Sequence, residues 1–279
     1  MDSRKLTPAH IAAFAAELRR QEKSAATVEK YRRDAARFLA FARSAPVDRA
    51  LTADYKAHLL ASGYADRSVN SMLASLNSLL AFLGWEDSKV KSVRLQHQAY
   101  CPAARELTRP EYLRLLAAAE GKPRLRLVME TICATGIRVS ELRHFTVESV
   151  RRGEVTIRCK GKTRRVLLPG KLRRRLLDYA ARTRLTSGPV FLTRGGKPLD
   201  RTAIWAQMKA LCRRAGVAAE KVFPHNLRHL FARSFYALEK DIAKLADVLG
   251  HSSIETTRIY LMTSGAEHRR QLDRLQLVL

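Results

Sequence analysis

The chain of 279 residues is long enough for two compact domains, and its 46% hydrophobic and 28% charged residues can build real cores, which excludes a disordered tail protein. It carries 52 Lys and Arg residues against 26 Asp and Glu residues, for a formal net charge of +26. Such a chain repels itself unless it meets a polyanion, so the composition favours a nucleic-acid-binding protein. The alternatives are a ribosome-associated protein and a soluble protein whose surface is merely basic.

The four cysteines are scattered and form no CxxC pair, which indicates reduced thiols rather than a zinc site or a disulfide framework. The stretch from Met1 to His10 contains no apolar run of the kind found in signal peptides. No segment approaches the roughly 18 apolar residues that a membrane span needs. We therefore expect a cytoplasmic protein that does not associate with membranes.

Residues 1–92 show only helical periodicity. Helices are expected to begin at Thr7, after Ser24 and at Thr52, because these residues can cap a helix and apolar residues follow them at spacings of three and four. A fourth helix is expected over residues 68–83. These patterns predict an all-helical N-terminal domain.

The helical periodicity then fails. Residues 87–105 are rich in Lys, Arg and Gln and show no clear apolar stripe, which predicts an interdomain linker, placed at residues 93–105, rather than an ordinary surface loop. A new helix is expected to begin at Thr108, where a capping residue is followed by a proline.

Residues 106–279 form the second predicted domain. An apolar helix is expected over 125–134, and the alternating, β-branched residues of 155–168 predict a β-hairpin. Residues 190–192 are expected to add a short strand, and residues 201–279 are mainly helical. The predicted fold class is mostly α, with an all-helical N-terminal domain and a mainly α second domain that contains a small antiparallel β-sheet.

Two segments of the second domain place cations where they could meet a phosphate. Arg138 follows Gly136 and is expected to start a helix at a point where backbone N–H groups also face outward, which suits an anion. Lys160 and Lys162 flank the glycine of the hairpin turn, from which a lysine can reach a groove and donate a proton. Taken singly, such side chains are more often solvated surface charges.

A third segment begins at Pro224. His225 and Arg228 are three residues apart and therefore share one face of the expected helix, which puts a titratable ring beside a planar cation, as a phosphoryl centre requires. His225 and His229 also have the spacing of a zinc pair. However, no glutamate lies between them and no third ligand is near in sequence, so a metal site is not expected.

The fourth segment ends in a tyrosine. His251 follows a glycine, and Tyr260 comes nine residues later. Ser252 and Glu255 predict a capping box, so that a helix over 253–261 carries Tyr260 near its end. By its neighbours alone, this tyrosine could also be a core residue.

In combination, these residues resemble the six-residue catalytic set of the tyrosine recombinases of the phage-integrase type. The set consists of Arg138, Lys160, His225, Arg228, His251 and Tyr260. The spacing of Ser24, Thr27 and Tyr31 resembles the start of that family's DNA-binding core domain, and residues 106–279 resemble its catalytic domain. The family's lysine usually precedes the turn glycine, which selects Lys160 over Lys162. The two-domain layout resembles Xer-like and transposon-type members.

The resemblance implies a site-specific recombinase that cuts and rejoins DNA by transesterification. The Tyr260 hydroxyl would attack a phosphodiester and form a 3′-phosphotyrosine, with His225 as base or hydrogen-bonding partner. Lys160 would protonate the departing 5′ oxygen. The bond energy is kept in the covalent link, so we expect no metal, nucleotide or other cofactor.

The remaining members of the set would stabilise charge. Arg138 and Arg228 would bracket the non-bridging oxygens with forked donors, and His251 would hydrogen-bond the same phosphate. The expected partners are double-stranded DNA with a specific recombination site and three further copies of the chain, with a partner recombinase as a variant.

The end of the chain is expected to link subunits. Ser264 and Glu267 predict a cap for a last helix whose apolar residues would dock on a neighbouring protomer, or fold back on their own core. Two other functions are compatible with parts of this residue set. A type IB topoisomerase uses a similar residue set to relax DNA, and a non-catalytic DNA-binding regulator would need neither Tyr260 nor Lys160.

Overall fold

The computed structural model describes residues 4–95, 100–101, 106–159, 162–193, 195–261, 263–264, 269–270 and 273–275. The chain divides into two compact units, residues 1–97 and 98–279. Of the predicted linker over 93–105, residues 96–99 and 102–105 lie outside the described residues, and the predicted domain boundaries stay a prediction. No helix in the described part of the chain is both long and apolar enough to traverse a lipid bilayer.

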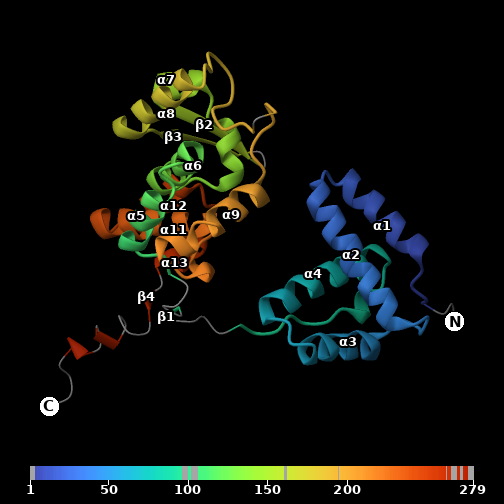
Figure 1. Ribbon diagram of the computed structural model, residues 1–279. Coiled ribbons are helices and arrows are strands. Elements are labelled where there is room, and N and C mark those ends of the chain that lie inside the picture. The colour runs from blue at the N-terminus through green and yellow to red at the C-terminus, as the bar shows by residue number, and fades with distance from the viewer. Residues whose placement is uncertain are drawn as a thin grey trace. The chain divides into compact units, whose positions relative to one another are not determined.

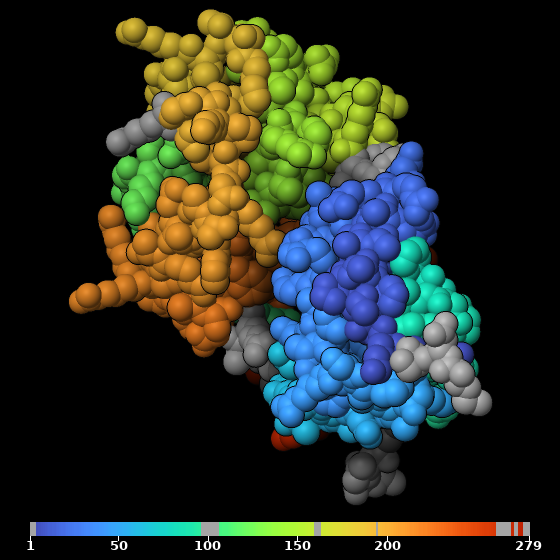
Figure 2. All heavy atoms as spheres, turned by 90° about the vertical axis from the view of Figure 1, so that its right-hand side faces the viewer, coloured from blue at the N-terminus to red at the C-terminus, as the bar shows by residue number. Residues whose placement is uncertain are grey.

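The N-terminal unit is helical, as predicted (Figure 1). Its elements are α1 (Pro8–Arg20), α2 (Ala25–Ala42), α3 (Arg49–Ala61), α4 (Asp66–Phe82) and the short 3₁₀ helix η1 (Glu86–Ser88). The predicted caps at Thr7 and Ser24 are confirmed, since their hydroxyls accept hydrogen bonds from the backbone N–H groups of His10 and Thr27. In Figure 2, the side chains of α1 and α2 pack closely on the visible face of this unit.

The predicted start of the third helix at Thr52 is wrong by one turn. The helix begins at Arg49, because the Asp48 carboxylate caps it by accepting a hydrogen bond of 2.8 Å from the Leu51 N–H. Thr52 is instead fully buried, and its hydroxyl donates to the Ser88 carbonyl over 2.6 Å. This threonine therefore ties α3 to η1 rather than capping the helix.

The C-terminal unit is mainly helical with a small antiparallel sheet, which confirms the predicted fold class. Its first part contains β1 (Tyr100–Cys101), α5 (Arg109–Ala118), α6 (Pro123–Thr135), the 3₁₀ helix η3 (Val139–His144), α7 (Val147–Arg152), β2 (Glu154–Cys159), β3 (Lys162–Leu167) and α8 (Gly170–Arg182). Its second part contains α9 (Arg201–Lys209), α10 (Cys212–Ala215), η4 (Ala219–Lys221), α11 (Pro224–Glu239), α12 (Ile242–Leu249), α13 (Ile254–Leu261) and β4 (Thr263–Ser264). The capping of α5 by Thr108 is confirmed, with Glu111 completing the capping box.

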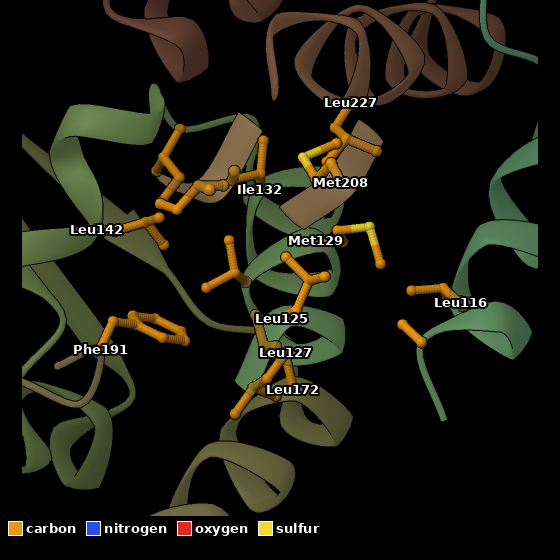
Figure 3. Packing of buried hydrophobic residues seen from close by; sticks show 14 of the residues in the cluster. Leu116, Leu125, Leu127, Met129, Ile132, Leu142, Leu172, Phe191, Met208 and Leu227 are labelled. Atoms are coloured by element: carbon orange, nitrogen blue, oxygen red, sulfur yellow. The ribbon is translucent and has the colours of Figure 1, made fainter. Parts of the chain in front are cut away.

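The core of this unit gathers around α6, which is apolar on most sides and is therefore surrounded by other elements. Figure 3 shows side chains converging on it from α5, α8, α9 and α11, namely Leu116, Leu172, Met208 and Leu227. In Figure 1, α7 and α8 lie at the hairpin end of the unit, and α11, α12 and α13 lie at the other. The segments that carry the predicted site residues are thus fixed to one shared core.

The predicted hairpin is confirmed. Strands β2 and β3 pair antiparallel, with Glu154 opposite Leu167 and Cys159 opposite Lys162. The predicted third strand at residues 190–192 is wrong, because the structure has only isolated bridges there, including one between Leu192 and Pro198. Proline lacks the N–H group that a strand needs to continue its ladder.

Candidate active site

Arg228 lies at the centre of the site, on the first turns of α11. Its side chain is 0% exposed, which is rare for an arginine and requires that its donors be paired. Nη1 donates to the Gly136 carbonyl, and Nη2 donates to the Leu249 carbonyl over 2.8 Å. These two carbonyls end α6 and α12, so the guanidinium joins the C-termini of both helices, where a cation is favoured.

Tyr260 lies near the end of α13 and is 6% exposed. Its hydroxyl oxygen is 3.4 Å from Nε of Arg228 and 3.4 Å from Nε2 of His225. The phenol can therefore accept from the guanidinium and donate to the imidazole. His229 packs on the tyrosine ring, with the ring centroids 4.3 Å apart. The tyrosine is buried, as in the core alternative, but polar partners surround its hydroxyl.

His251 joins this group from the turn between α12 and α13. Its Nε2 lies 2.9 Å from Nη2 of Arg228, and its Nδ1 lies 2.8 Å from the hydroxyl of Thr257, which is fully buried. Since a guanidinium can only donate, Nε2 is the acceptor, so Nδ1 carries the proton and donates to Thr257. Burial and the nearby Arg228 lower the pKa of His251 to about 4, so the ring is neutral at neutral pH.

The two histidines of α11 are also held neutral. Burial, and then the charge of Arg228, lower the pKa of His225 below its ordinary value. Burial, followed by the neighbouring His225, lowers the pKa of His229 to about 3. The rings of His225 and His229 meet edge to face with their centroids 4.8 Å apart. A neutral His225 can accept a proton from Tyr260, as a base must.

Arg138 is placed differently from the prediction. It precedes the 3₁₀ helix η3 rather than starting an α-helix, and its backbone N–H is not open to an anion, because the Glu141 carboxylate accepts it over 2.7 Å. The same carboxylate binds Nη1 of Arg138 at 3.1 Å. The arginine side chain remains 41% exposed, so its guanidinium is available to a ligand. The candidate anion donor is therefore the side chain alone.

The sequence reasoning missed Glu141 and Arg164. Glu141 is 3% exposed, and its second oxygen also accepts a hydrogen bond of 2.6 Å from Nη2 of Arg164, on β3. Nη1 of Arg164 donates to the Val248 carbonyl at the end of α12. A carboxylate three residues after Arg138 was a detectable sign of the first pair. Arg164 is 23 residues away from Glu141 in the sequence, so no local pattern indicates that the two side chains are paired.

Two glycines end the helices that border the site. Gly136 and Gly250 both have positive φ, +65° and +67°, and cap the C-termini of α6 and α12. A Cβ at either position would also collide with a neighbour, so both backbone shape and close packing require glycine.

The predicted capping box of Ser252 and Glu255 is wrong. The Ser253 hydroxyl accepts the hydrogen bond from the Glu255 N–H instead, and α13 begins at Ile254. Lys160 lies outside the described residues, and Lys162 is described only as the first residue of β3.

The structure thus brings together five of the six predicted residues. His225, Arg228, His251 and Tyr260 contact one another directly, and Arg138 is held beside them through Glu141 and Arg164. A phenol between a neutral imidazole and a permanent cation can lose its proton while it attacks an electrophile. The arginines can stabilise the anionic oxygens of a phosphoryl group.

Comparison with protein families gives two matches. Residues 105–266 match the phage integrase family, and residues 5–87 match the phage integrase N-terminal SAM-like domain. The tyrosine recombinase XerA of Pyrococcus furiosus is 29% identical over 273 residues, covering 95% of this chain and 93% of XerA. The tyrosine recombinase XerD of Staphylococcus aureus is 29% identical over 272 residues, covering 88% of this chain and 91% of XerD.

Solved structures share the fold. A lambda integrase tetramer bound to a Holliday junction matches with a TM-score of 0.75 at 17% identity, covering 93% of this chain and 78% of that one. The XerH site-specific recombinase bound to its difH substrate matches with a TM-score of 0.70 at 19% identity, covering 95% of this chain and 84% of XerH.

Proposed function

The chain belongs to the phage integrase family, and on this premise we propose that it is a site-specific tyrosine recombinase whose nucleophile is Tyr260. The observation that carries the proposal is the position of the Tyr260 hydroxyl, 3.4 Å from both His225 Nε2 and Arg228 Nε. The relatives reported above are recombinases, which favours strand exchange over the relaxation activity of a type IB topoisomerase.

Cleavage begins when the Tyr260 oxygen attacks the phosphorus of a DNA phosphodiester. Its proton passes to Nε2 of His225, which is neutral and within reach. The new bond is a 3′-phosphotyrosine, and the bond between phosphorus and the 5′ oxygen breaks. Lys160 gives its proton to that oxygen, which leaves as a 5′-hydroxyl. Ligation reverses these steps with the 5′-hydroxyl of a second DNA strand.

Charge on the non-bridging oxygens is stabilised by Arg138 and Arg228. Arg228 is already fixed by two carbonyls, so it loses little freedom when the phosphate arrives. Both ring nitrogens of His251 already have hydrogen-bond partners, Nε2 with Arg228 and Nδ1–H with Thr257. His251 could donate a hydrogen bond to the phosphate only after giving up one of these contacts. Since the arginines carry the charge, neither a metal ion nor a nucleotide takes part.

The partners in this proposal are double-stranded DNA with a specific site and a tetramer of the chain on two such sites. Lambda integrase has been solved as a tetramer bound to a Holliday junction, which supports this assembly. The segment after Tyr260, with the predicted cap of Ser264 and Glu267, would link one protomer to the next. Residues 262, 265–268, 271–272 and 276–279 of that segment lie outside the described residues. A recombinase must reach the DNA, so the cytoplasmic location expected from the sequence is part of the proposal.

The nucleophile is tested by Tyr260→Phe on a nicked suicide substrate, on which the cleaved strand cannot be rejoined. The variant keeps the ring that packs on His229 and loses only the hydroxyl, so it should bind the site but form no covalent adduct on a denaturing gel. Tyr236→Phe, which removes a hydroxyl from the same helical cluster, is the control and should form the adduct. An adduct with Tyr260→Phe, or none with the intact protein, would refute the assignment.

The lysine is tested with a substrate whose 5′ bridging oxygen is replaced by sulfur. A thiolate leaves without protonation, so Lys160→Ala should be slow on normal DNA and substantially rescued on the sulfur substrate. Arg138→Ala should not be rescued, because sulfur does not relieve charge on the non-bridging oxygens. Rescue of Lys162→Ala instead would move the acid by two residues along the hairpin.

A further inference from the structure

Two adjacent arginines on β3 have opposite surroundings. The side chain of Arg165 is 74% exposed, and its nearest carboxylate, Glu154, is 4.0 Å away. The side chain of Arg164 is only 15% exposed. Arg164 lies opposite Ile157 in the hairpin register, and Ile157 is buried in the core. Arg164 therefore points inward from the hairpin, where a charged group needs partners.

The partners of Arg164 lie on two other elements of the unit. Nη2 donates to Glu141, the carboxylate that also holds the backbone and side chain of Arg138. Nη1 donates to the Val248 carbonyl, close to the turn that carries His251. One guanidinium thus connects the hairpin, η3 and the end of α12. Its planar fork suits this use, because two donors with a fixed geometry reach two acceptors at once.

Gly250 leaves the room that this side chain occupies. A Cβ at residue 250 would lie 2.6 Å from Cδ and 2.8 Å from Nε of Arg164, closer than real Cβ contacts allow. The arginine thus crosses directly over the backbone that precedes His251.

The hairpin needs such an anchor because its turn carries the lysines. Lys160 and Lys162 precede Arg164 by four and two residues, so the length of extended chain allows them at most about 13 Å from the anchor. General acid catalysis requires a proton donor within hydrogen-bonding distance of the leaving oxygen. A displacement of about 1 Å at such a group can cost about a hundredfold in rate.

We propose that Arg164 is a positioning residue that holds the lysine-bearing hairpin in a fixed position relative to Arg138 and His251. It does so through Glu141 and the Val248 carbonyl, without contacting the phosphate itself. The inference rests on the proposed recombinase function and adds to it the residue that fixes the general acid relative to the anion-binding side of the site. Arg164 belongs to no part of the six-residue set.

The test compares Arg164→Met with Arg165→Met on normal and 5′-sulfur suicide substrates. Both variants remove one positive charge from the same strand, but only the first removes the anchor. If Arg164 positions the lysine, Arg164→Met should form adduct about a hundredfold more slowly on normal DNA and recover most of that loss on the sulfur substrate. Arg165→Met should have similar rates to the intact protein on both.

The melting temperature and binding to the recombination site serve as controls that each variant is folded. Arg164→Lys keeps the charge but has one ammonium in place of a fork, so it should fold, reach one acceptor well and show a smaller loss with the same sulfur rescue. If Arg164→Met does not fold, Arg164→Lys carries the test. A general loss of stability would slow both substrates alike and would give no selective rescue.

Four outcomes would overturn the inference. Equal slowing of the Arg164 variants on both substrates would mean that the residue acts through Arg138 or through stability. No slowing at all would mean that the anchor is dispensable. If neither Lys160→Ala nor Lys162→Ala is rescued, the lysine assignment in the proposed function fails, and the positioning role fails with it. If a lysine variant is rescued and the Arg164 variants are not, only the positioning role fails.

Discussion

Gly136 allows a packing cost to be separated from a backbone cost. It has φ of +65°, and a Cβ there would lie 2.3 and 2.5 Å from two ring carbons of Phe231 and 3.0 Å from a methyl carbon of Leu249. The Phe231 ring cannot retreat freely, because it packs on Phe235 with the centroids 5.8 Å apart. Gly216 is the matched control, since it has φ of +58° and nothing within 4 Å of the added Cβ.

The magnitudes follow from these two environments. A left-handed backbone costs an alanine about 1 kcal/mol, and this is the whole expected effect of Gly216→Ala. Overpacking a filled core adds about 1 to 3 kcal/mol, so Gly136→Ala should lower the free energy of unfolding by about 2 to 4 kcal/mol. Gly136→Ala should also reduce the rate of adduct formation, because the Gly136 carbonyl that would be displaced accepts a hydrogen bond from Arg228.

Fluorescence can follow the C-terminal unit alone. The chain has two tryptophans, Trp85 in the N-terminal unit and Trp205 in the C-terminal unit. In a Trp85→Phe background, urea unfolding detected by tryptophan emission therefore reports the unit that contains both glycines. Equal destabilisation by Gly136→Ala and Gly216→Ala, or unchanged adduct formation by Gly136→Ala, would refute the packing argument.

Three further predictions concern pH, metals and assembly. Because the pKa of His229 is about 3 in the folded state against an ordinary 6.5, only the unfolded chain takes up a proton at pH values between these. The free energy of unfolding should thus fall as the pH drops from 6.5 toward 3, and His229→Phe should reduce the slope in urea titrations; an unchanged slope would contradict this origin. Cleavage should proceed in excess EDTA without nucleotide, whereas strict dependence on Mg²⁺ would indicate a different mechanism. Deleting residues 266–279 should leave binding to a single site largely intact but weaken synapsis of paired sites, and unchanged sedimentation would make this segment an intramolecular element.

Local interactions made much of the fold predictable from the sequence. The caps at Thr7, Ser24 and Thr108 each bond a backbone N–H three residues away, so a short pattern contains both partners. The hairpin was predictable because alternation and a turn glycine are also local. The errors at Thr52 and Ser252 arose where a neighbouring capping residue, Asp48 or Ser253, took the role instead.

Contacts between distant segments could not be predicted in this way. The resemblance grouped the candidate catalytic residues, but it gave no reason for the burial of Arg228 between the ends of α6 and α12. The roles of Glu141 and Arg164 depend on the hairpin folding against η3 and α12, which no spacing within one segment encodes. The catalytic assignment itself, with Lys160 as acid, stays a prediction that the substrate experiments address.

The hydrogen bonds around Tyr260 link four residues in a ring that begins and ends on α13. Thr257 bonds His251, His251 bonds Arg228, Arg228 bonds Tyr260, and Tyr260 is three residues from Thr257 on the same helix. Helix α13 is therefore attached through both Thr257 and Tyr260, and moving it away breaks the contacts of both residues together. Occupancy of the site by this helix should be all or none rather than graded. Displacing α13 would remove the nucleophile and the partner that orients His251 together, and its return would restore both in one movement.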